Sequence, residues 1–205
     1  MIERVVTSGT FSLDGADFAV DNNVWVVGDD RQVVVVDAAH DHRPIVDAVG
    51  GRRCVAIIAT HGHNDHINAA VDLADALDAP VWLHPADRML WDVVHPGRAP
   101  DAPLSDGQVV QFGGMSLTVL STPGHSPGGV CLHDPAGAVV FSGDTLFHGG
   151  PGATGRSFSD YGTIVDSIRD RLLVLHPATR VLTGHGEETT IGDEALHLVE
   201  WEAAR

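Results

Sequence analysis

Lysine is absent from this sequence, so all twelve of its cationic side chains are arginines. Aspartate and glutamate together number 28, which gives a formal net charge of -16. Nucleic-acid binding requires basic side chains clustered on one face, because they must neutralise phosphates. The charge balance therefore argues against a nucleic-acid partner. The all-arginine composition also indicates a bacterium with a high-GC genome.

Cysteine is scarce as well, and long hydrophobic runs are missing. Cys54 and Cys131 each lie in an apolar strand-like run, which predicts buried free thiols and a reducing compartment. No segment approaches the ~20 apolar residues of a membrane span. The N-terminus, "MIERVVTSGTF", carries Glu3 and Arg4 where a secretory signal would be apolar. We therefore expect a cytoplasmic protein with no membrane partner.

Apolar runs alternate with turn signals along the whole chain. With 205 residues and 43% hydrophobic content, the chain is long enough for one substantial core, so we expect a single domain over residues 1–205. A monomer or a small homo-oligomer is expected. The predicted strands cover residues 22–30, 32–39, 53–60, 107–113, 115–122, 128–134, 138–144 and 179–185. The predicted helices follow Pro44, run from Ile67 to Pro80 and from Tyr161 to Leu175, and cover residues 191–203. This order predicts an α/β fold with two packed sheets and outer helices.

The segment "THGHNDH", residues 60–66, follows a buried strand and precedes a helix. His61, His63 and His66 cannot share one helix face, so an i, i+4 metal motif does not fit. On an extended turn His61 and His63 point the same way, and Asp65 and His66 follow into the helix, which gives two ligand pairs. The alternatives are a solvated loop, structural imidazoles and an engineered tag. A tag would be terminal and repetitive, and this segment is neither.

Three further strand ends carry residues of the same kind. They are His125 in "STPGHSPGG", Asp144 in "FSGDTLF" and His185 in "LTGHGEE". Each stands beside glycine, where the backbone can turn tightly around an ion. These downstream residues favour a metal site over a solvated loop or a set of structural imidazoles.

This ordered set of residues resembles the metallo-β-lactamase superfamily over nearly the whole chain. The resemblance implies an αββα sandwich of two mixed β-sheets with outer helices. It also implies two divalent metal ions at one edge between the sheets, with zinc expected and iron or manganese as alternatives. In that arrangement the first metal is held by His61, His63 and His125, the second by Asp65, His66 and His185, and Asp144 bridges both.

The segments "GDTLFHGG" and "TGHGEETTIGDE" resemble the short glyoxalase II-like hydrolases, which cleave small thioesters. The resemblance implies a hydroxide held between the two metals as the nucleophile, with Asp65 and Asp144 as catalytic carboxylates. Asp144 replaces the cysteine of many true β-lactamases, which weighs against antibiotic hydrolysis. His63 stands where flavodiiron proteins carry glutamate, which weighs against oxygen reduction.

The thiol carrier and two rival functions remain open from the sequence. The chain ends about one helix after His185, whereas full-length glyoxalase II enzymes carry a C-terminal helical domain that helps to bind glutathione. We therefore expect another carrier, and the high-GC composition makes mycothiol the candidate. A persulfide dioxygenase-like oxidoreductase with one iron is the main alternative. A non-catalytic metal-stabilised module is disfavoured, because seven ligands exceed what a structural site needs.

Four more residues are candidates for supporting roles. Asp37, after "VVVVD", either orients a metal-bound histidine or caps the next turn. His40 lies in a polar loop, where it is solvated or contacts substrate, and His148 follows Asp144 closely enough to line the mouth of the site. The Gly149 to Ser159 stretch is predicted to be a mobile loop beside the metals, with a plain connection as the alternative. Its one cation, Arg156, would contact an anionic part of the substrate.

Overall fold

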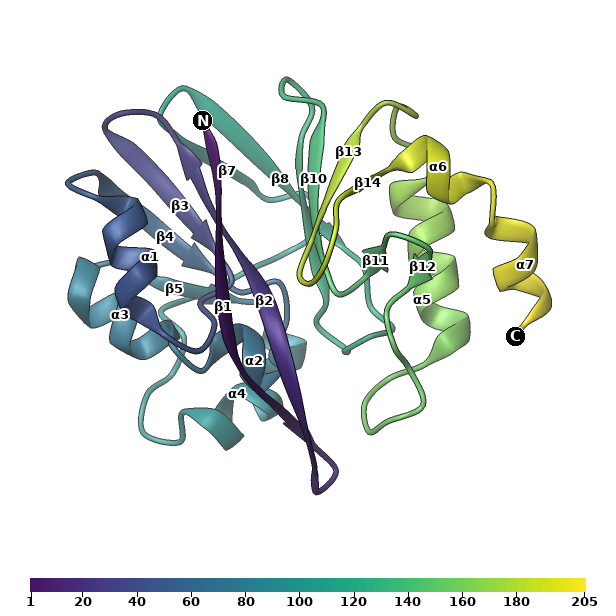
Figure 1. The fold of residues 1–205 in the computed structure, drawn as a ribbon, viewed down its shortest axis with the longest axis horizontal. Coiled ribbons are helices and arrows are strands. Elements are labelled where there is room, and N and C mark those ends of the chain that lie inside the picture. The colour runs from purple at the N-terminus through teal and green to yellow at the C-terminus, as the bar shows by residue number, and fades with distance from the viewer.

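Two six-stranded sheets pack face to face in a computed structural model that describes residues 1–205 (Figure 1). The first sheet contains β1 (Ile2–Leu13), β2 (Ala16–Gly28), β3 (Gln32–Val36), β4 (Arg53–Ile58), β5 (Val81–Leu83) and β6 (Ala102–Pro103), in that order. The second has the order β14 (Thr189–Thr190), β13 (Arg180–Thr183), β10 (Val139–Gly143), β9 (Val130–Asp134), β8 (Met115–Ser121) and β7 (Val109–Phe112). Each sheet contains both parallel and antiparallel pairs.

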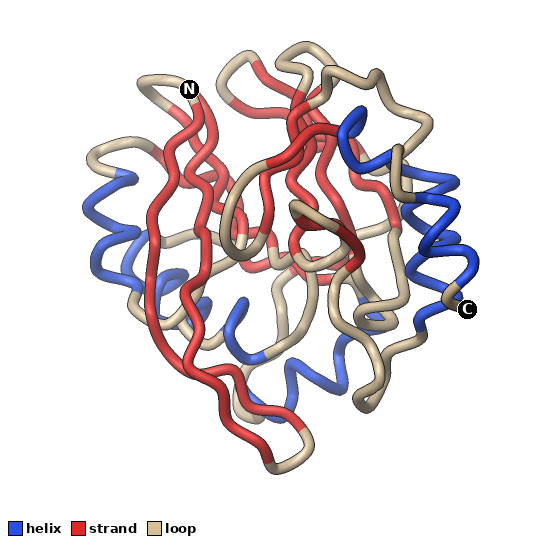
Figure 2. Tube along the Cα trace, turned by 45° about the vertical axis from the view of Figure 1, so that its right-hand side comes forward, coloured by secondary structure: helices blue, strands red, loops and turns tan.

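Helices cover the outer face of each sheet, so the predicted αββα sandwich is confirmed (Figure 2). The first sheet is covered by α1 (His42–Val49), α2 (Asn64–Ile67), α3 (Ala70–Leu77), the 3-10 turn η1 (Pro85–Asp87) and α4 (Arg88–Val94). The second is covered by α5 (Tyr161–Ser167), its π-helical continuation η2 (Ile168–Leu172), α6 (Ile191–Ala195) and α7 (Leu198–Ala203). A small hairpin, β11 (Leu146–Phe147) and β12 (Gly150–Pro151), stands apart from both sheets.

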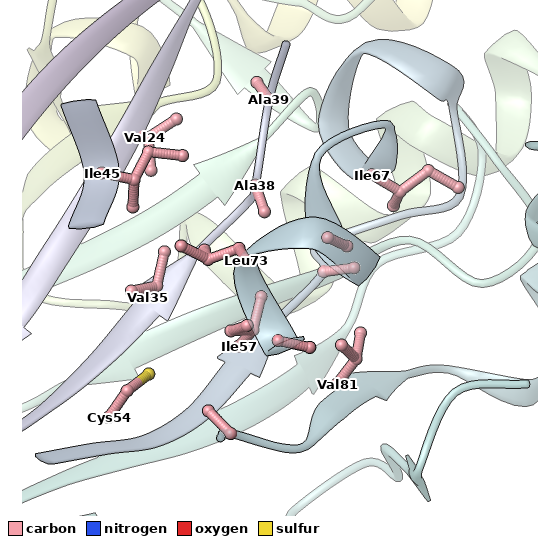
Figure 3. Close-up of a cluster of buried hydrophobic side chains, with 14 of the residues drawn as sticks. Val24, Val35, Ala38, Ala39, Ile45, Cys54, Ile57, Ile67, Leu73 and Val81 are labelled. Atoms are coloured by element: carbon pink, nitrogen blue, oxygen red, sulfur yellow. The ribbon is translucent and has the colours of Figure 1, made fainter. Parts of the chain in front are cut away.

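Three buried clusters correspond to the three interfaces between these four layers. Alternate residues of β3 show how one strand serves two of them, because successive side chains point to opposite faces. Val33 and Val35 pack with the helices of the first sheet, whereas Val34 and Val36 pack between the two sheets. Figure 3 shows Val35 beside Leu73 of α3 in the outer cluster. This double burial is the reason that the strand is apolar at nearly every position.

The structure extends and divides several predicted elements. Helix α1 begins at His42, before Pro44, because the side chain of Asp41 accepts a hydrogen bond from the Arg43 N–H (2.9 Å) and caps the helix. The helix predicted from Ile67 to Pro80 corresponds to α3, which is preceded by the short helix α2 that was not predicted, and residues 191–203 form α6 and α7. Strands β5 and β6 and helix α4 were not predicted. The expected free thiols are confirmed, since both cysteines are buried and unpaired.

Strand β1 was also missed, although the chain carries a signal for it. Most side chains of β1 are exposed or half-buried, so the strand lacks an apolar stripe. It forms by antiparallel pairing with β2 along its full length, from Ile2 opposite Val27 to Leu13 opposite Ala16. The turn residues Asp14 and Gly15 both have positive φ (54° and 75°). An Asp-Gly pair in this conformation is the favoured two-residue hairpin turn.

One edge of the sandwich gathers the loops that carry the candidate ligands. The loop after β4, the β8–β9 connection and the segments after β10 and β13 all meet there. Backbone hydrogen bonds join them across the two sheets, from the Val130 N–H to the Thr60 carbonyl (2.8 Å) and from the Asn23 N–H to the Gly184 carbonyl (2.7 Å). No helix of the structure combines the length and the apolar character needed to cross a membrane.

Candidate metal centre

All seven predicted ligands converge at this edge. Their nitrogen and oxygen atoms form three overlapping groups, within each of which the atoms lie no more than 4.8 Å apart. The groups are His61, His63 and His125; His61, His66 and Asp144; and Asp65, His66 and His185. We call the first the three-histidine group and the last the Asp65 group. The structure therefore brings together residues that are far apart in the sequence in the two sets that the resemblance implied.

Asp144 lies between these two groups. One of its carboxylate oxygens is 3.6 Å from Nε2 of His125, in the three-histidine group. Its oxygens are also 3.3 Å from Nε2 of His66 and 3.4 Å from Nε2 of His185, in the Asp65 group. A carboxylate in this position can contact two cations at once.

Four buried polar atoms in the centre have no hydrogen-bond partner. They are Nε2 of His61, Nε2 of His63, Oδ1 of Asp65 and Oδ1 of Asp144. Each such atom costs about 1–3 kcal/mol, so a concentration of them in one place indicates that a ligand supplies the missing partner. Imidazole and carboxylate donors in this number fit zinc, iron or manganese.

Backbone carbonyls fix the protonation of two of the histidines. Nδ1 of His125 lies 2.8 Å from the carbonyl oxygen of Ala153, and Nδ1 of His185 lies 2.7 Å from that of Asp21. A carbonyl can only accept a hydrogen bond, so Nδ1 carries the hydrogen in both rings. Nε2 is then the nitrogen that faces the centre in both rings, where it can bind a metal ion in place of a proton or a neighbouring N–H.

Asp37 fixes the hydrogen of His66 on Nδ1, which agrees with the predicted orienting role. Its buried carboxylate lies 2.9 Å from Nδ1 of His66 and accepts hydrogen bonds from the Thr60 N–H (2.7 Å) and hydroxyl (3.0 Å). The Thr60 hydroxyl, having donated to Asp37, can accept from Nδ1 of His61, 3.1 Å away. Asp37 thus orients one histidine directly and a second one through Thr60.

Burial and the neighbouring charges divide the histidines into two kinds. Burial, reinforced by His125, lowers the pKa of His63 to about 3, and burial together with His66 places the pKa of His61 well below its usual range. Burial also disfavours the charged form of His185, but the carboxylates of Asp144 and Asp65 together outweigh it and raise that pKa to about 10. The pKa of His66 is raised well above its usual value, because Asp144, Asp65 and Asp37 together outweigh burial. The carboxylates around His66 and His185 therefore favour positive charge at this position.

His40 was expected to be solvated or to contact substrate. The structure instead joins it to the centre through Asn22. The His40 backbone N–H donates to Oδ1 of Asn68 (2.6 Å), which turns the Asn68 amide nitrogen toward Nδ1 of His40 (3.1 Å). Nδ1 must therefore accept, so Nε2 carries the hydrogen and donates to Oδ1 of Asn22 (2.8 Å). The Asn22 amide nitrogen consequently points into the centre, where it donates to Oδ2 of Asp65 (3.1 Å).

Asn22 is a site residue that the sequence analysis missed. Its side chain is fully buried, and its amide nitrogen also lies 3.3 Å from Nε2 of His66 and 3.5 Å from Nε2 of His185. Within a predicted strand, an asparagine carries no sign of this role. The fit around His40 is close, because a Cβ on Gly9 of β1 would lie 2.1 Å from Nδ1 of His40.

The remaining two candidates lie at the mouth. The side chain of His148 is 66% exposed and, with Phe147 and His185, lines a surface depression beside the Asp65 group. The guanidinium of Arg156 lies 4.7 Å from the centroid of the Phe18 ring, at the β1–β2 hairpin. Arg156 also lines a pocket that reaches the three-histidine group at His63.

The loop that carries Arg156 is attached on both sides. A Cβ on Gly152 would lie 1.8 Å from the carbonyl oxygen of Asp144, so the loop passes directly against the metal centre. At the other side, the Ser157 N–H donates to the carboxylate of Asp14 (3.0 Å) at the hairpin turn. The structure therefore places the loop beside the centre, as predicted.

Comparisons with known proteins agree with this geometry. The model of the metallo-β-lactamase superfamily matches residues 18–185. A Haemophilus influenzae protein named hydroxyacylglutathione hydrolase GloC is 30% identical over 187 residues, which cover 83% of this chain and 87% of that protein. The crystal structure of BLEG-1 B3 metallo-β-lactamase is similar with a TM-score of 0.79 and 30% identity, covering 95% of this chain and 99% of that chain. The structure of TTHA1623 in a di-iron-bound form has a TM-score of 0.76 and 38% identity, covering 86% and 93%.

The chain therefore belongs to the metallo-β-lactamase superfamily. Its fold and its cluster of histidines and aspartates are those of a metallohydrolase of this superfamily. The identity of the metals and of the substrate is a separate question.

The contacts of Asn22 lead to a first prediction. Asn22→Leu keeps the approximate size of the side chain but removes its donor to Asp65, so we expect the zinc affinity of the Asp65 group to fall about 10-fold or more. The three-histidine group serves as the internal control and should keep its affinity. Stepwise zinc titration against a chromophoric chelator measures both. Two unchanged binding steps would contradict this role of Asn22.

Proposed function

We propose that this protein is a binuclear metal-dependent hydrolase that cleaves a small thioester. The observation that carries the proposal is the position of Asp144 between two ligand groups whose buried atoms lack partners. The first metal would be held by His61, His63 and His125, the second by Asp65, His66 and His185, and Asp144 would contact both. Two divalent cations so held supply a water of lowered pKa as the nucleophile and stabilise negative charge on a carbonyl oxygen.

The carboxylates of the centre favour a thioester over an amide. Burial opposes ionisation of Asp144 and Asp65, but the neighbouring His66 and His185 together keep the pKa of Asp144 well below its usual range and lower that of Asp65. A divalent cation held by each group would favour the ionised carboxylates in the same direction. Neither group can therefore donate a proton to a leaving group at neutral pH. A thiolate leaves without such a donor, whereas an amine requires one.

The relatives support the same substrate class. The Haemophilus influenzae relative is named as a hydrolase of hydroxyacylglutathione, an acyl conjugate of a thiol. One similar solved structure is described as a β-lactamase and another as binding two irons, so β-lactams and iron belong in the tests. A persulfide dioxygenase, the main alternative, retains most of these ligands but uses one iron, so metal content separates the two functions.

Metal analysis of the protein purified under mild conditions tests this proposal most directly. We expect about two metal ions per chain, with zinc predominant, and hydrolysis of acyl thioesters that chelation abolishes and zinc restores. A β-lactam assayed in parallel should be cleaved far more slowly. One iron per chain with thiol-dependent oxygen uptake would establish the dioxygenase instead, and preferential β-lactam cleavage would refute the thioester assignment.

The bridging position of Asp144 generates a second prediction. Asp144→Ala should lower the occupancy of both metal positions and abolish thioester hydrolysis, because the shared carboxylate contacts ligands of both groups. Metal content by mass spectrometry and activity are measured on the same sample. Thermal unfolding of the metal-free variant checks that the sandwich is intact. Inactivity with both metals fully retained would show that Asp144 does not bridge.

The carrier of the thioester is the part of this proposal that depends on Arg156. We propose a mycothiol-type conjugate, held at its thioester by the centre and at its carrier by the Gly149 to Ser159 loop. Relatives 37% identical over 161 residues occur in Mycobacterium bovis and Mycobacterium tuberculosis. Arg156 forms no salt bridge, although the hydrogen bonds from Ser157 and the charge of Arg156 lower the pKa of the nearby Asp14. Its guanidinium is held over Phe18, where it can contact an anionic group.

Substitution of Arg156 gives the third prediction. Arg156→Ala should raise KM for the carrier-linked thioester much more than for a small model thioester, because only the former loses a remote contact. Arg53→Ala, at the exposed start of β4 and away from the site, is the matched control and should change neither KM. Equal effects of Arg156→Ala on both substrates would refute the contact. A preference for glutathione thioesters would refute the carrier while leaving the metallohydrolase intact.

A further inference from the structure

A buried carboxylate outside the ligand set joins the two loops of the three-histidine group. Asp87, at the end of η1, is 0% exposed. Its Oδ2 accepts hydrogen bonds from the Gly62 N–H (2.8 Å) and the Ser126 hydroxyl (2.7 Å). Its Oδ1 accepts from the Gly128 N–H (2.5 Å). All three donors belong to loops at the metal centre.

The positions of these donors relate directly to the ligands. Gly62 stands between His61 and His63, and Ser126 follows His125. Each histidine of the group is therefore one residue away from a hydrogen bond to the same carboxylate. The two loops are far apart in the sequence, and Asp87 lies between them in a third segment, after β5.

Close packing leaves no freedom at these contacts. A Cβ on Gly62 would lie 3.0 Å from Cβ of Asp87 and 2.9 Å from Cβ of Leu90. A Cβ on Gly128 would lie 2.8 Å from both the backbone nitrogen and Cγ of Asp87. Because both loops approach within contact distance at glycine positions, a shift of Asp87 would be transmitted to them without slack.

Burial of the Asp87 carboxylate carries a desolvation penalty. No arginine or histidine forms an ion pair with it, and burial raises its pKa, while the Ser126 hydroxyl and the Gly128 and Gly62 N–H groups lower it. An apolar side chain could fill the same space without the desolvation penalty of a carboxylate. What an apolar side chain cannot do is accept three hydrogen bonds from two separate loops.

We propose that Asp87 is a positioning residue that holds the His61–His63 loop and the His125 loop at the separation at which the three histidines bind one metal ion. This inference rests on the proposed function, because it assumes that the three-histidine group takes a metal. Asp87 makes no hydrogen bond to the segments that carry Asp144 and His185. Asp65 and His66 of the other group follow the His61–His63 loop in α2 and make no hydrogen bond to Asp87 themselves. The effect of Asp87 should therefore be larger at the three-histidine group than at the Asp65 group.

The experiment measures zinc affinity with one metal position disabled at a time. In a His185→Ala parent, which retains the three-histidine group, Asp87→Ala should weaken zinc binding about 10- to 100-fold. In a His125→Ala parent, which retains the Asp65 group, the same substitution should weaken zinc binding far less. Competition with a chromophoric chelator gives both values without relying on catalysis. Unchanged affinity in the first parent, or an equal loss in both parents, would overturn the inference.

Milder variants keep the test decisive if Asp87→Ala fails to fold. Ser126→Ala removes one of the three hydrogen bonds. Asp87→Asn retains the two at Oδ2 but places an amide N–H against the Gly128 N–H. Each should weaken zinc binding in the His185→Ala parent by a smaller factor than the full loss. Asp134→Asn removes another buried carboxylate, at the opposite end of β9, and as the control should have no effect.

The outcomes separate this inference from the proposed function. Zinc binding that depends on Asp87, in a protein that hydrolyses no thioester, would refute the proposed function and support the positioning role. Thioester hydrolysis by a two-metal enzyme whose zinc affinity is unchanged by substitution of Asp87 and Ser126 would support the proposed function and refute the positioning role. A His185→Ala parent that binds no zinc would overturn the inference, because the three-histidine group would then be no metal site.

Discussion

The rest of the structure depends on the crowding of imidazoles and carboxylates at one buried edge between the two sheets. Nitrogens of His63 and His125 lie 2.9 Å apart, and those of His66 and His185 lie 3.2 Å apart. Such atoms are stable together only if a shared proton or cation lies among them. The pKa directions show the same constraint, since protons gather where Asp144 adds negative charge. A metal ion meets this need with more charge and more ligand bonds than a proton can.

A cluster of this kind needs a second set of residues that faces away from the centre. Every imidazole that offers one nitrogen inward must have its other nitrogen satisfied or fixed. Asp37 and backbone carbonyls do this for His66, His125 and His185, and Asp87 fixes the loops rather than the rings. These contacts are largely buried, so water does not readily replace them. The orientation of the ligands is consequently fixed by hydrogen bonds that the protein itself supplies.

The sequence predicted the residues that converge here because they lie shortly after apolar strands, and the ends of such strands meet at one edge of the sandwich. Asp37 was predictable for the same reason, although its partner was not. Asp87 and Asn22 could not be found this way, since their roles depend on contacts with segments distant in the sequence. Strand β1 escaped prediction because pairing with β2, and not burial of an apolar face, holds it in place. Pattern analysis detects buried faces, whereas hydrogen-bond partners emerge only from the tertiary structure.

The β1–β2 hairpin connects the mouth of the site with its interior. Phe18 of β2 supports Arg156 at the mouth, and Asn22, further along the same strand, donates to Asp65 in the centre. On the neighbouring strand, Gly9 packs directly against His40, which orients the amide of Asn22. A displacement of the hairpin would therefore change both the cation at the mouth and the hydrogen bond to a ligand. The outer half of the hairpin, which buries little apolar surface, is thus attached to the site that it helps to build.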